Sequence, residues 1–185
     1  LITSDKCYDN LELKRGYHEN DRLGGPDPYS ASKGAAEIAI SSYIRSFFPN
    51  EGNITIGVGR AGNVIGGGDW AKDRIIPDCI RAWSKNTIVD IRNPQATRPW
   101  QFVLEPLSGY LNLAIQLKSN SKLHGQAFNF GPPENQDHSV GDLVTLMTKY
   151  WKNNNWNDVS SKYGGPNESN LLQLNCEKAR NLLKW

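Results

Sequence analysis

The stretch from Asp27 to Lys33 constrains the fold most, because it predicts where a long helix begins. Asp27 is a good N-cap residue, and Pro28 suits the first helical position, where its missing N–H is not needed. The helix is expected to end near Phe47, since Pro49 follows and disfavours helix before it. These local signals predict one helix over residues 28–47.

Within this helix, Tyr29 and Lys33 lie four residues apart and therefore share one face. Ionising a phenol near pH 7 requires about 4 kcal/mol. An ammonium at roughly 5 Å supplies about 3 kcal/mol at an effective dielectric of 20, and the helix dipole adds up to ~1 kcal/mol. The pair can therefore form a base. The alternative is a surface tyrosine beside a solvated lysine, because this spacing also arises by chance.

A second polar run, Thr3-Ser4-Asp5-Lys6, follows the apolar Leu1-Ile2 and precedes Tyr29 by 26 positions. The two apolar residues indicate the end of a buried strand. Side chains at the carboxyl end of a parallel strand lie where an open α/β sheet places its binding site. The hydroxyl and carboxyl groups of this run are therefore expected near Tyr29.

The composition excludes several classes of protein. The net charge of +2 and the absence of a basic block predict no nucleic-acid or membrane partner. Cys7, Cys79 and Cys176 are far apart and form no metal or disulfide pattern, which favours a reducing, cytoplasmic compartment. The sequence has no signal peptide and no apolar run of transmembrane length.

The rest of the chain predicts alternating strands and helices, which is typical of an α/β fold. Ser139 and Asp142 resemble a capping box that opens one of the helices. Three successive glycines at 66–68 either bring backbone N–H groups to a ligand or form a plain turn. Strands are expected at 53–59, 87–91 and 127–130, an extended piece at 98–103, and helices at 74–84, 104–118, 139–151 and 176–183.

A hydroxyl, then Tyr29, then Lys33, in this order and spacing, resembles the catalytic set of the short-chain dehydrogenases. Three segments, at 3–8, 63–70 and 98–101, are similar to the extended members that act on nucleotide sugars. The similarity is strongest to their CDP-glucose 4,6-dehydratase branch, and it spans essentially the whole chain. It departs at Phe102, where that branch has a histidine.

The resemblance implies an α/β fold: the second half of an extended Rossmann-type domain plus a small nucleotide-sugar-binding lobe. Residues 1–60 would form the catalytic part of the Rossmann-type domain. Residues 61–185 would form mainly the small lobe, with elements that return to the sheet. A Gly-rich fingerprint of an N-terminal NAD-binding half is absent, so the chain is expected to be a fragment that is inactive alone, with an exposed sheet edge. The helix starting at Pro28 is expected to form a homodimer or a higher homo-oligomer.

The resemblance also implies a reaction with NAD as cofactor, in which CDP-D-glucose becomes CDP-4-dehydro-6-deoxy-D-glucose for lipopolysaccharide synthesis. Tyr29 would take the proton of the sugar C4 hydroxyl, while Lys33 favours the phenolate and holds the nicotinamide ribose. Thr3 would hydrogen-bond the C4 oxygen, and Asp5 would protonate the departing C6 hydroxyl. Lys6 stands where related dTDP-glucose dehydratases have a glutamate. It would act either as a neutral base at C5 or as a cation beside the enolate.

Four further residues match the nucleotide-sugar contacts of these enzymes: Asn63, Arg74, Arg98 and Asn129. No metal site is expected. Two other functions stay open. A nucleotide-sugar 4-epimerase would share the hydroxyl, tyrosine and lysine but needs no acid at Asp5. A non-catalytic domain that binds nucleotide sugar needs none of the catalytic chemistry.

Overall fold

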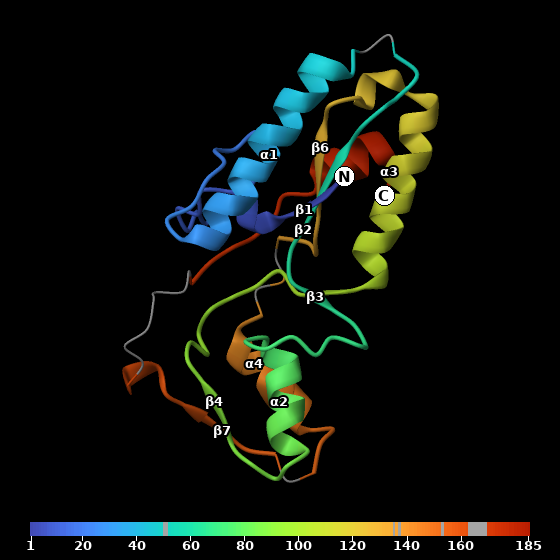
Figure 1. Ribbon diagram of the computed structural model, residues 1–185. Helices are drawn as coiled ribbons and strands as arrows, with labels where there is room; N and C mark the ends of the chain where they lie inside the picture. The colour runs from blue at the N-terminus through green and yellow to red at the C-terminus, as the bar shows by residue number, and fades with distance from the viewer. Residues whose placement is uncertain (50–51, 135, 137, 153, 163–169) are drawn as a thin grey trace.

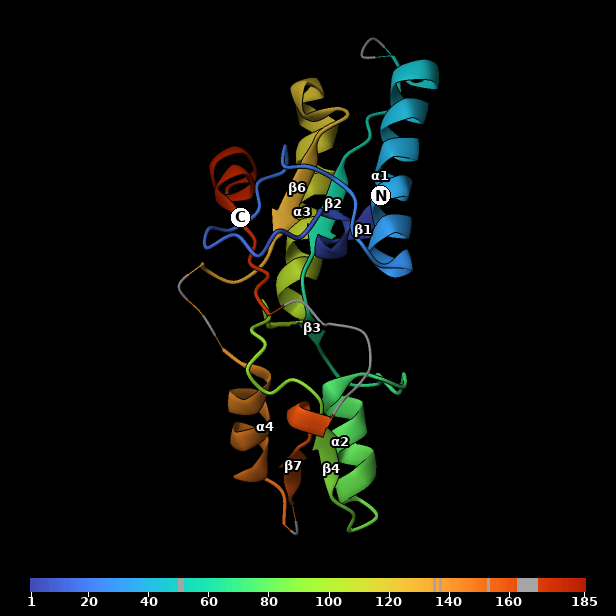
Figure 2. The same ribbon diagram turned by 90° about the vertical axis from the view of Figure 1, so that its left-hand side faces the viewer.

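The computed structural model describes residues 1–49, 52–134, 136, 138–152, 154–162 and 170–185. Figures 1 and 2 show two lobes, one above the other, joined by a narrow waist. The upper lobe contains a parallel sheet between two long helices. The lower lobe contains two shorter helices and a pair of short strands. The chain crosses between the lobes several times, so each lobe is built from separate stretches of sequence.

The upper sheet has the strand order β1 (Ile2–Ser4), β2 (Val58–Ala61) and β6 (Ala127–Phe130), and all three strands run parallel. The register places Thr3 beside Arg60, and Arg60 beside Asn129. Side chains alternate between the two faces of a sheet, so these three polar residues point to the same face. The strand predicted at 127–130 is confirmed.

The strand predicted at 53–59 is wrong in its limits, because β2 begins only at Val58 and continues to Ala61. The residues before it bond to the turn that precedes β6 instead of to a strand. Ile56 N–H donates to His124 Nδ1 at 3.0 Å, and the Ile56 carbonyl accepts from Gly125 N–H at 2.7 Å. A ladder forms only where a partner strand is present, which sequence alone does not reveal.

Helix α1 (Pro28–Phe47) covers one face of this sheet, and its predicted limits are confirmed. The Asp27 carboxylate caps it by accepting from the N–H groups of Tyr29 and Ser30 at 2.9 and 3.0 Å. Helix α3 (Leu104–Ser119) covers the other face and also agrees with prediction. It lies so close that a side chain at Gly59 would meet the Tyr110 ring at 2.8 Å.

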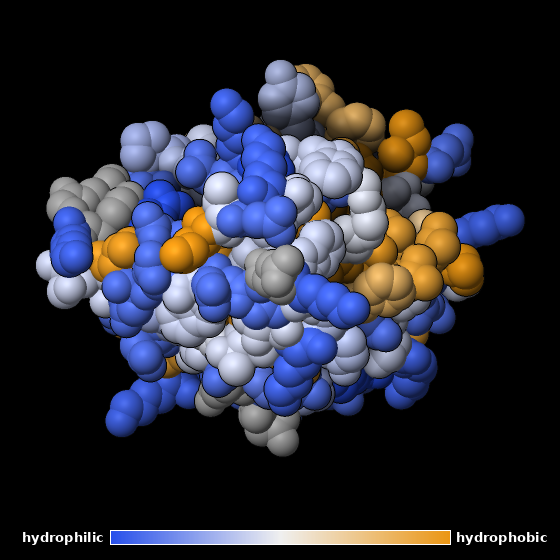
Figure 3. All heavy atoms as spheres, turned by 90° about the horizontal axis from the view of Figure 1, so that it is seen from below, coloured by the Kyte–Doolittle hydropathy of each residue, from blue (hydrophilic) through white to orange (hydrophobic). Residues whose placement is uncertain are grey.

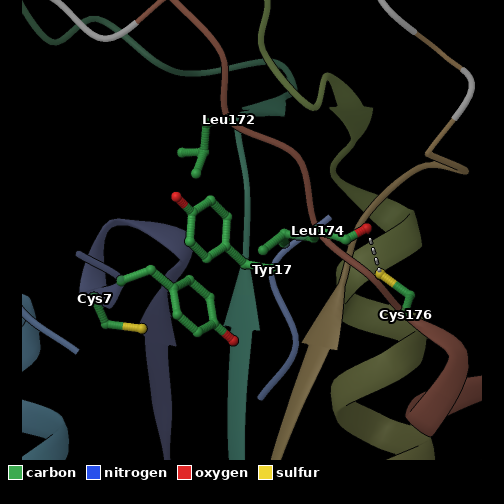
Figure 4. Close-up of a cluster of buried hydrophobic side chains, with 6 residues drawn as sticks. Cys7, Tyr17, Leu172, Leu174 and Cys176 are labelled. Atoms are coloured by element: carbon green, nitrogen blue, oxygen red, sulfur yellow. Dashed lines mark hydrogen bonds between the residues drawn. The ribbon is translucent and has the colours of Figure 1, made fainter. Parts of the chain in front are cut away.

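Two apolar clusters fill the upper lobe. The first surrounds the stacked rings of Tyr8 and Tyr17, whose centroids are 5.2 Å apart; its members are Cys7, Tyr8, Tyr17, Leu172, Leu174 and Cys176. Figure 4 shows Tyr17 beside Leu172 and Leu174, with Cys7 nearby. The second lies under α3 and contains Leu113, Leu123, Phe128, Phe130, Ala179 and Leu183. The predicted last helix includes a π-helical turn (Ala179–Leu183), whose first and last residues lie in this second cluster.

The lower lobe packs α2 (Ile75–Trp83) and α4 (Val140–Thr148) against a parallel pair, β4 (Val89–Ile91) and β7 (Trp156–Asp158). Its core is apolar and consists of Cys79, Trp83, Val89, Ile91 and Val144. The capping box of Ser139 and Asp142 is confirmed. Seen from below, this lobe is mostly hydrophilic with separate hydrophobic patches (Figure 3).

In the lower lobe one predicted helix end is wrong and one strand was missed. The helix predicted over 139–151 ends at Thr148, because Lys149 and Tyr150 make tighter bonds to carbonyls three residues back. The strand β7 was not predicted, because its sequence lies in a polar, Asn-rich stretch.

Short 3-10 helices occupy Asp5–Cys7 (η1), Ser121–Leu123 (η2) and Ser160–Lys162 (η3).

The waist consists of β3 (Val64–Ile65) paired in parallel with β5 (Gln101–Phe102). After β3 come the three glycines. A side chain at Gly66 would meet Val103 at 2.8 Å, and Gly68 has φ +82, which favours glycine. Packing and turn geometry therefore explain two of these three glycines.

One side of the upper lobe presents hydrocarbon to solvent. Within the described ranges, β1 pairs only with β2, and Leu1 and Ile2 are exposed. A stripe of exposed side chains also runs along α3, formed by Leu104, Leu107, Leu111 and Ile115. Among the residues the structure places, no helix is both long and apolar enough to cross a membrane.

All three cysteines are buried and unpaired in the structure. Burial raises the pKa of Cys7, Cys79 and Cys176 to about 12 in each case. A thiol with so high a pKa is almost wholly protonated at neutral pH and is therefore a poor nucleophile. The cysteines act as small core residues here.

Candidate active site

The candidate site is built where β1 ends and α1 begins. The chain leaves β1 at Ser4 and turns into η1, and α1 packs directly on this turn. Gly34 makes the approach possible, because a side chain there would meet Gly24 N at 2.8 Å and the Cys7 carbonyl at 3.3 Å. The first turns of α1 therefore lie beside the segment that carries Asp5 and Lys6.

Tyr29 and Lys33 come together as the helical spacing predicts. The Lys33 ammonium lies 5.4 Å from the centre of the Tyr29 ring. Tyr29 is 57% exposed, so its phenol is open to a ligand from outside the described chain. The two side chains are therefore neighbours on the first turns of α1.

The side chains of the sequence neighbours Asp5 and Lys6 also lie in contact. Lys6 Nζ is 3.1 Å from Asp5 Oδ2, and Ser4 Oγ donates to Asp5 Oδ1 at 3.0 Å. Asp5 is only 2% exposed. Burial raises the pKa of the Tyr110 phenol to about 12, and the negative charge of Asp5 adds to this rise. Asp5 is thus a buried carboxylate with partners on both oxygens.

Thr3 lies differently from what the sequence suggests. Its hydroxyl donates to the Glu37 carboxylate on α1, so its proton points into the helix–sheet interface. The next residue, Ser4, places its hydroxyl on Asp5 and accepts from Lys6 N–H. Sequence reasoning missed Ser4 as a candidate hydroxyl. The signal was its position directly before Asp5 in the same polar run.

Sequence reasoning also missed Glu37 and its partner Arg60. Arg60 Nε and Nη2 donate to the two Glu37 oxygens at 2.8 and 2.9 Å, and both side chains are about 95% buried. The available signal was spacing, since Glu37 continues the face of Tyr29 and Lys33 by another four residues. Nothing local in the sequence pointed to Arg60.

Asn129 was predicted to contact the substrate, but the structure places it fully inside the protein, with 0% exposure. Its Nδ2 donates to the carbonyls of Tyr17 and Asn175 at 2.8 and 3.1 Å. Its Oδ1 accepts from the Tyr8 hydroxyl at 2.6 Å. Neither amide N–H is left for a ligand, so Asn129 acts as a core polar residue in this structure.

The three other predicted binding residues lie at the waist and in the lower lobe. Asn63 precedes β3, and its buried Oδ1 has no hydrogen-bond partner. Arg98 is half-buried beside the extended segment that leads to β5, and its Nη1 donates to the Thr97 carbonyl at 2.8 Å. Arg74 stands at the start of α2, 2.8 Å from Asp69, and its side chain is 61% exposed. Phe102 is exposed on β5.

No model of a protein family matches the chain. A curated relative does: CDP-glucose 4,6-dehydratase of Salmonella typhimurium is 48% identical over 191 aligned positions, which cover 100% of this chain and 52% of the relative. The similarity therefore extends through both lobes. The chain spans about half the length of the relative that it matches.

Solved structures agree on the fold. UDP-glucuronic acid 4-epimerase from Bacillus cereus superposes with a TM-score of 0.81 at 20% identity, over 99% of this chain and 54% of its own. The chain has the fold of the extended short-chain dehydrogenases. Two dTDP-glucose 4,6-dehydratases share this dehydrogenase fold. The enzyme of Bacillus anthracis has a TM-score of 0.73 at 20% identity, over 100% of this chain and 54% of its own. The enzyme of Streptomyces venezuelae has a TM-score of 0.77 at 14% identity, over 100% of this chain and 53% of its own.

These likenesses confirm the α/β fold and the resemblance to the extended short-chain dehydrogenases predicted from the sequence. At 20% identity or less, the solved structures establish the dehydrogenase fold alone. The 48% identity to the curated dehydratase is the closer guide to chemistry. The roles of the individual site residues stay predictions.

Proposed function

We propose that the protein carrying this chain is an NAD-dependent dehydratase, which converts CDP-D-glucose to CDP-4-dehydro-6-deoxy-D-glucose. The observation that carries the proposal is the 48% identity to a CDP-glucose 4,6-dehydratase along the whole chain. The site supports it with an exposed phenol beside an ammonium and a buried carboxylate beside a second ammonium. An epimerase has no use for a proton donor at C6, so Asp5 favours the dehydratase.

Tyr29 and Lys33 fit a dinucleotide with a ribose diol. The Lys33 ammonium lies 5.4 Å from the centre of the Tyr29 ring, Tyr29 is exposed, and both side chains are able to donate hydrogen bonds to hydroxyl oxygens. We assign them to the nicotinamide ribose. NAD, when bound, would supply the chemistry of hydride removal at the sugar C4 carbon and of hydride return at C6 after water has left.

The proton of the C4 hydroxyl passes to Tyr29 in this proposal. Lys33 supports the transfer by stabilising the phenolate electrostatically. A hydroxyl orients the C4 oxygen, and two residues compete for that role. Thr3 is the one that the sequence predicts, while Ser4 lies at the strand end with its oxygen already beside Asp5.

Loss of water from C5 and C6 falls to Asp5 and Lys6. Asp5 delivers a proton to the departing C6 hydroxyl. Lys6 either takes the C5 proton as a neutral amine or stabilises the enolate as a cation. Lys6 Nζ lies 3.1 Å from Asp5 Oδ2, so the two groups would act on the same part of the sugar.

Arg74, Arg98 and Asn63 are proposed to hold the nucleotide sugar. A guanidinium fork suits diphosphate oxygens, and the unpartnered Asn63 oxygen is an acceptor for a ligand N–H or hydroxyl. Asn129 would support the site from within the core. We further propose a cytoplasmic homodimer through α1, on whose surface Ile38, Tyr43 and Phe47 are exposed.

Replacing Tyr29 by Phe in the complete gene product tests the proposal. Turnover of CDP-glucose should fall at least about 10²-fold, the usual contribution of a positioned general base. Binding of CDP-glucose should hardly change, because the ring stays. Tyr150→Phe is the matched control, since Tyr150 is an exposed tyrosine to which no role is assigned, and its activity should equal that of the parent.

Product analysis separates the alternatives. A 4-keto-6-deoxy sugar is the expected product, whereas a 4-epimer would identify an epimerase. Binding of CDP-glucose without conversion would identify a non-catalytic domain. Activity of Tyr29→Phe within a few-fold of the parent would reject Tyr29 as the base.

The role of Lys6 is tested by deuterium uptake from solvent at C5. If Lys6 is the base, Lys6→Met abolishes uptake and Lys6→Glu restores part of it, because a carboxylate is also able to take the proton. Uptake by Lys6→Met at the parent rate would assign the C5 proton to another group.

A further inference from the structure

We propose that Glu37 and Arg60 form a buried clamp that positions the Tyr29–Lys33 pair. The clamp contacts neither substrate nor cofactor in this proposal. It acts through α1, and it therefore rests on the proposed role of Tyr29. Its two members lie 23 residues apart in the chain, on α1 and β2.

The inner face of α1 is the first observation. A helix that lies on a sheet normally buries an apolar stripe. The buried residues of α1 are Gly34, Glu37 and Ile44, while its larger hydrophobic residues, such as Ile38 and Phe47, are exposed. Few apolar contacts therefore hold the first turns of α1, which carry Tyr29 and Lys33, against the sheet. The Glu37 carboxylate occupies a buried position where a leucine would be usual.

The geometry of the pair is the second observation. Arg60 and Glu37 share two parallel hydrogen bonds of 2.8 and 2.9 Å. Arg60 Nη1 further donates to the Tyr8 hydroxyl and the Glu19 carbonyl, each at 2.9 Å. Thr3 donates to Glu37 from β1. Glu37 is thus fixed to two strands at once, and Arg60 is fixed in turn by the loop that follows η1.

The direction of these bonds gives the clamp its effect. Along the helix, Glu37 stands one turn beyond Lys33 and two turns beyond Tyr29 on the same face. Two parallel bonds to a planar guanidinium fix both the rotation of a helix and its position along the sheet. Apolar contacts are non-directional, so they constrain the rotation and the position of a helix less. A displacement of about 1 Å in a catalytic group costs on the order of 10²-fold in rate.

Stability alone does not explain the pair. Replacing a buried ion pair by apolar residues of similar volume is often neutral or stabilising. The ion pair therefore has a function other than holding the fold together. Specification of a single helix position beside η1, where Asp5 and Lys6 lie, is the function that its location supports.

The test uses a double variant, Glu37→Met with Arg60→Met, in the complete gene product with NAD and CDP-glucose. Both charges disappear together, so neither is left buried without a partner. We expect a melting temperature equal to or above that of the parent. We also expect a KM for CDP-glucose within about threefold and a kcat lower by about 10- to 100-fold. The control, Arg15→Met with Asp21→Asn, removes a bidentate pair from the same lobe at the surface and should leave all three values unchanged.

A double-mutant cycle shows whether the clamp acts through Tyr29. In a Tyr29→Phe background, the same two substitutions should lower kcat by less than about threefold, because the group that they position is already lost. Glu37→Asp gives a second measure, since it keeps the charge and shortens the arm by one methylene. Its kcat should lie between those of the parent and the double variant, with KM unchanged.

Retention of the parent kcat by a folded double variant would overturn the inference. An equal loss of kcat in the Tyr29→Phe background would also overturn it, because the effect would then be a general one on the fold. If the double variant does not fold, the same comparison is made with Glu37→Asp, whose full activity would reject the clamp. Failure of the proposed function is seen separately in the parent enzyme, as a 4-epimer product or as no conversion of CDP-glucose. Normal turnover by Tyr29→Phe alone would reject the role of Tyr29 on which the clamp rests.

Discussion

In the upper lobe, the buried charged residues Glu37 and Arg60 join helix α1 to the sheet, and each is about 4% exposed. In the lower lobe, the contact between α2 and β4 is made by Cys79, Trp83 and Ile91. Both lobes have the same α/β construction, with parallel strands under helices. The lower lobe thus joins helix to sheet by apolar packing, whereas charged hydrogen bonds join α1 to the sheet in the upper lobe.

Ion pairs in the lower lobe lie at the surface. Arg74 meets Asp69 at 2.8 Å with 61% of its side chain exposed, and Arg81 meets Asp78 in a partly exposed pair. Water and salt weaken such pairs. These arginines therefore stay free to change partner, which suits the proposed binding of diphosphate by Arg74. Arg60, by contrast, is held from several sides.

The largest expected difference between the lobes comes from removing one arginine from each. Arg60→Met leaves the Glu37 carboxylate buried without its partner and should lower the free energy of unfolding by about 3–5 kcal/mol. Arg74→Met breaks an exposed pair and should cost less than about 1 kcal/mol. Urea unfolding of both variants measures the two values. Equal losses would mean that burial does not distinguish the two pairs.

A smaller effect is expected in the lower core. Trp83→Phe reduces the volume of a buried ring and removes the hydrogen bond from its Nε1 to the Asn155 carbonyl, which is 3.0 Å long. We expect a loss of about 1–3 kcal/mol in the free energy of unfolding. Turnover should stay near the parent value, since no proposed catalytic residue lies in this cluster. Loss of turnover without loss of stability would contradict the separation of roles between the lobes.

The smallest expected effect is at the start of α1. Asp27→Ala removes the cap from Tyr29 and Ser30 and should cost about 1 kcal/mol at pH 7. Hydrogen bonds from the Ser30 side chain and backbone, and from the Tyr29 backbone, lower the pKa of Asp27 below its usual value. A carboxyl group with a lowered folded-state pKa stabilises the protein above its unfolded pKa and loses this contribution as the pH falls through the folded value.

The difference between parent and Asp27→Ala should accordingly shrink on acidification. Urea midpoints measured at several pH values between about 3 and 7 follow it. A difference that stays constant over this range would show that the cap acts without the carboxylate charge.

Local signals in the sequence determined much of the fold. Asp27 and Pro28 set the start of α1, Pro49 followed its end, and Ser139 with Asp142 set the start of α4. Each signal acts within one helical turn, where neighbouring residues alone decide the outcome. The same holds for Tyr29 and Lys33, since the pitch of a helix fixes their approach.

Only the tertiary structure decided which polar residues lie inside. From the sequence alone, Glu37 looks like an exposed helix residue, and only the structure places Arg60 beside it. Asn129 likewise looks like a ligand contact, but its amide is bonded to Tyr8, Tyr17 and Asn175. A polar group is buried only when a partner compensates for the lost water. The partners here are distant in sequence, up to 121 residues for Tyr8 and Asn129, so no local pattern records them. Assembly of the sheet brings them together and thereby turns Thr3 towards α1.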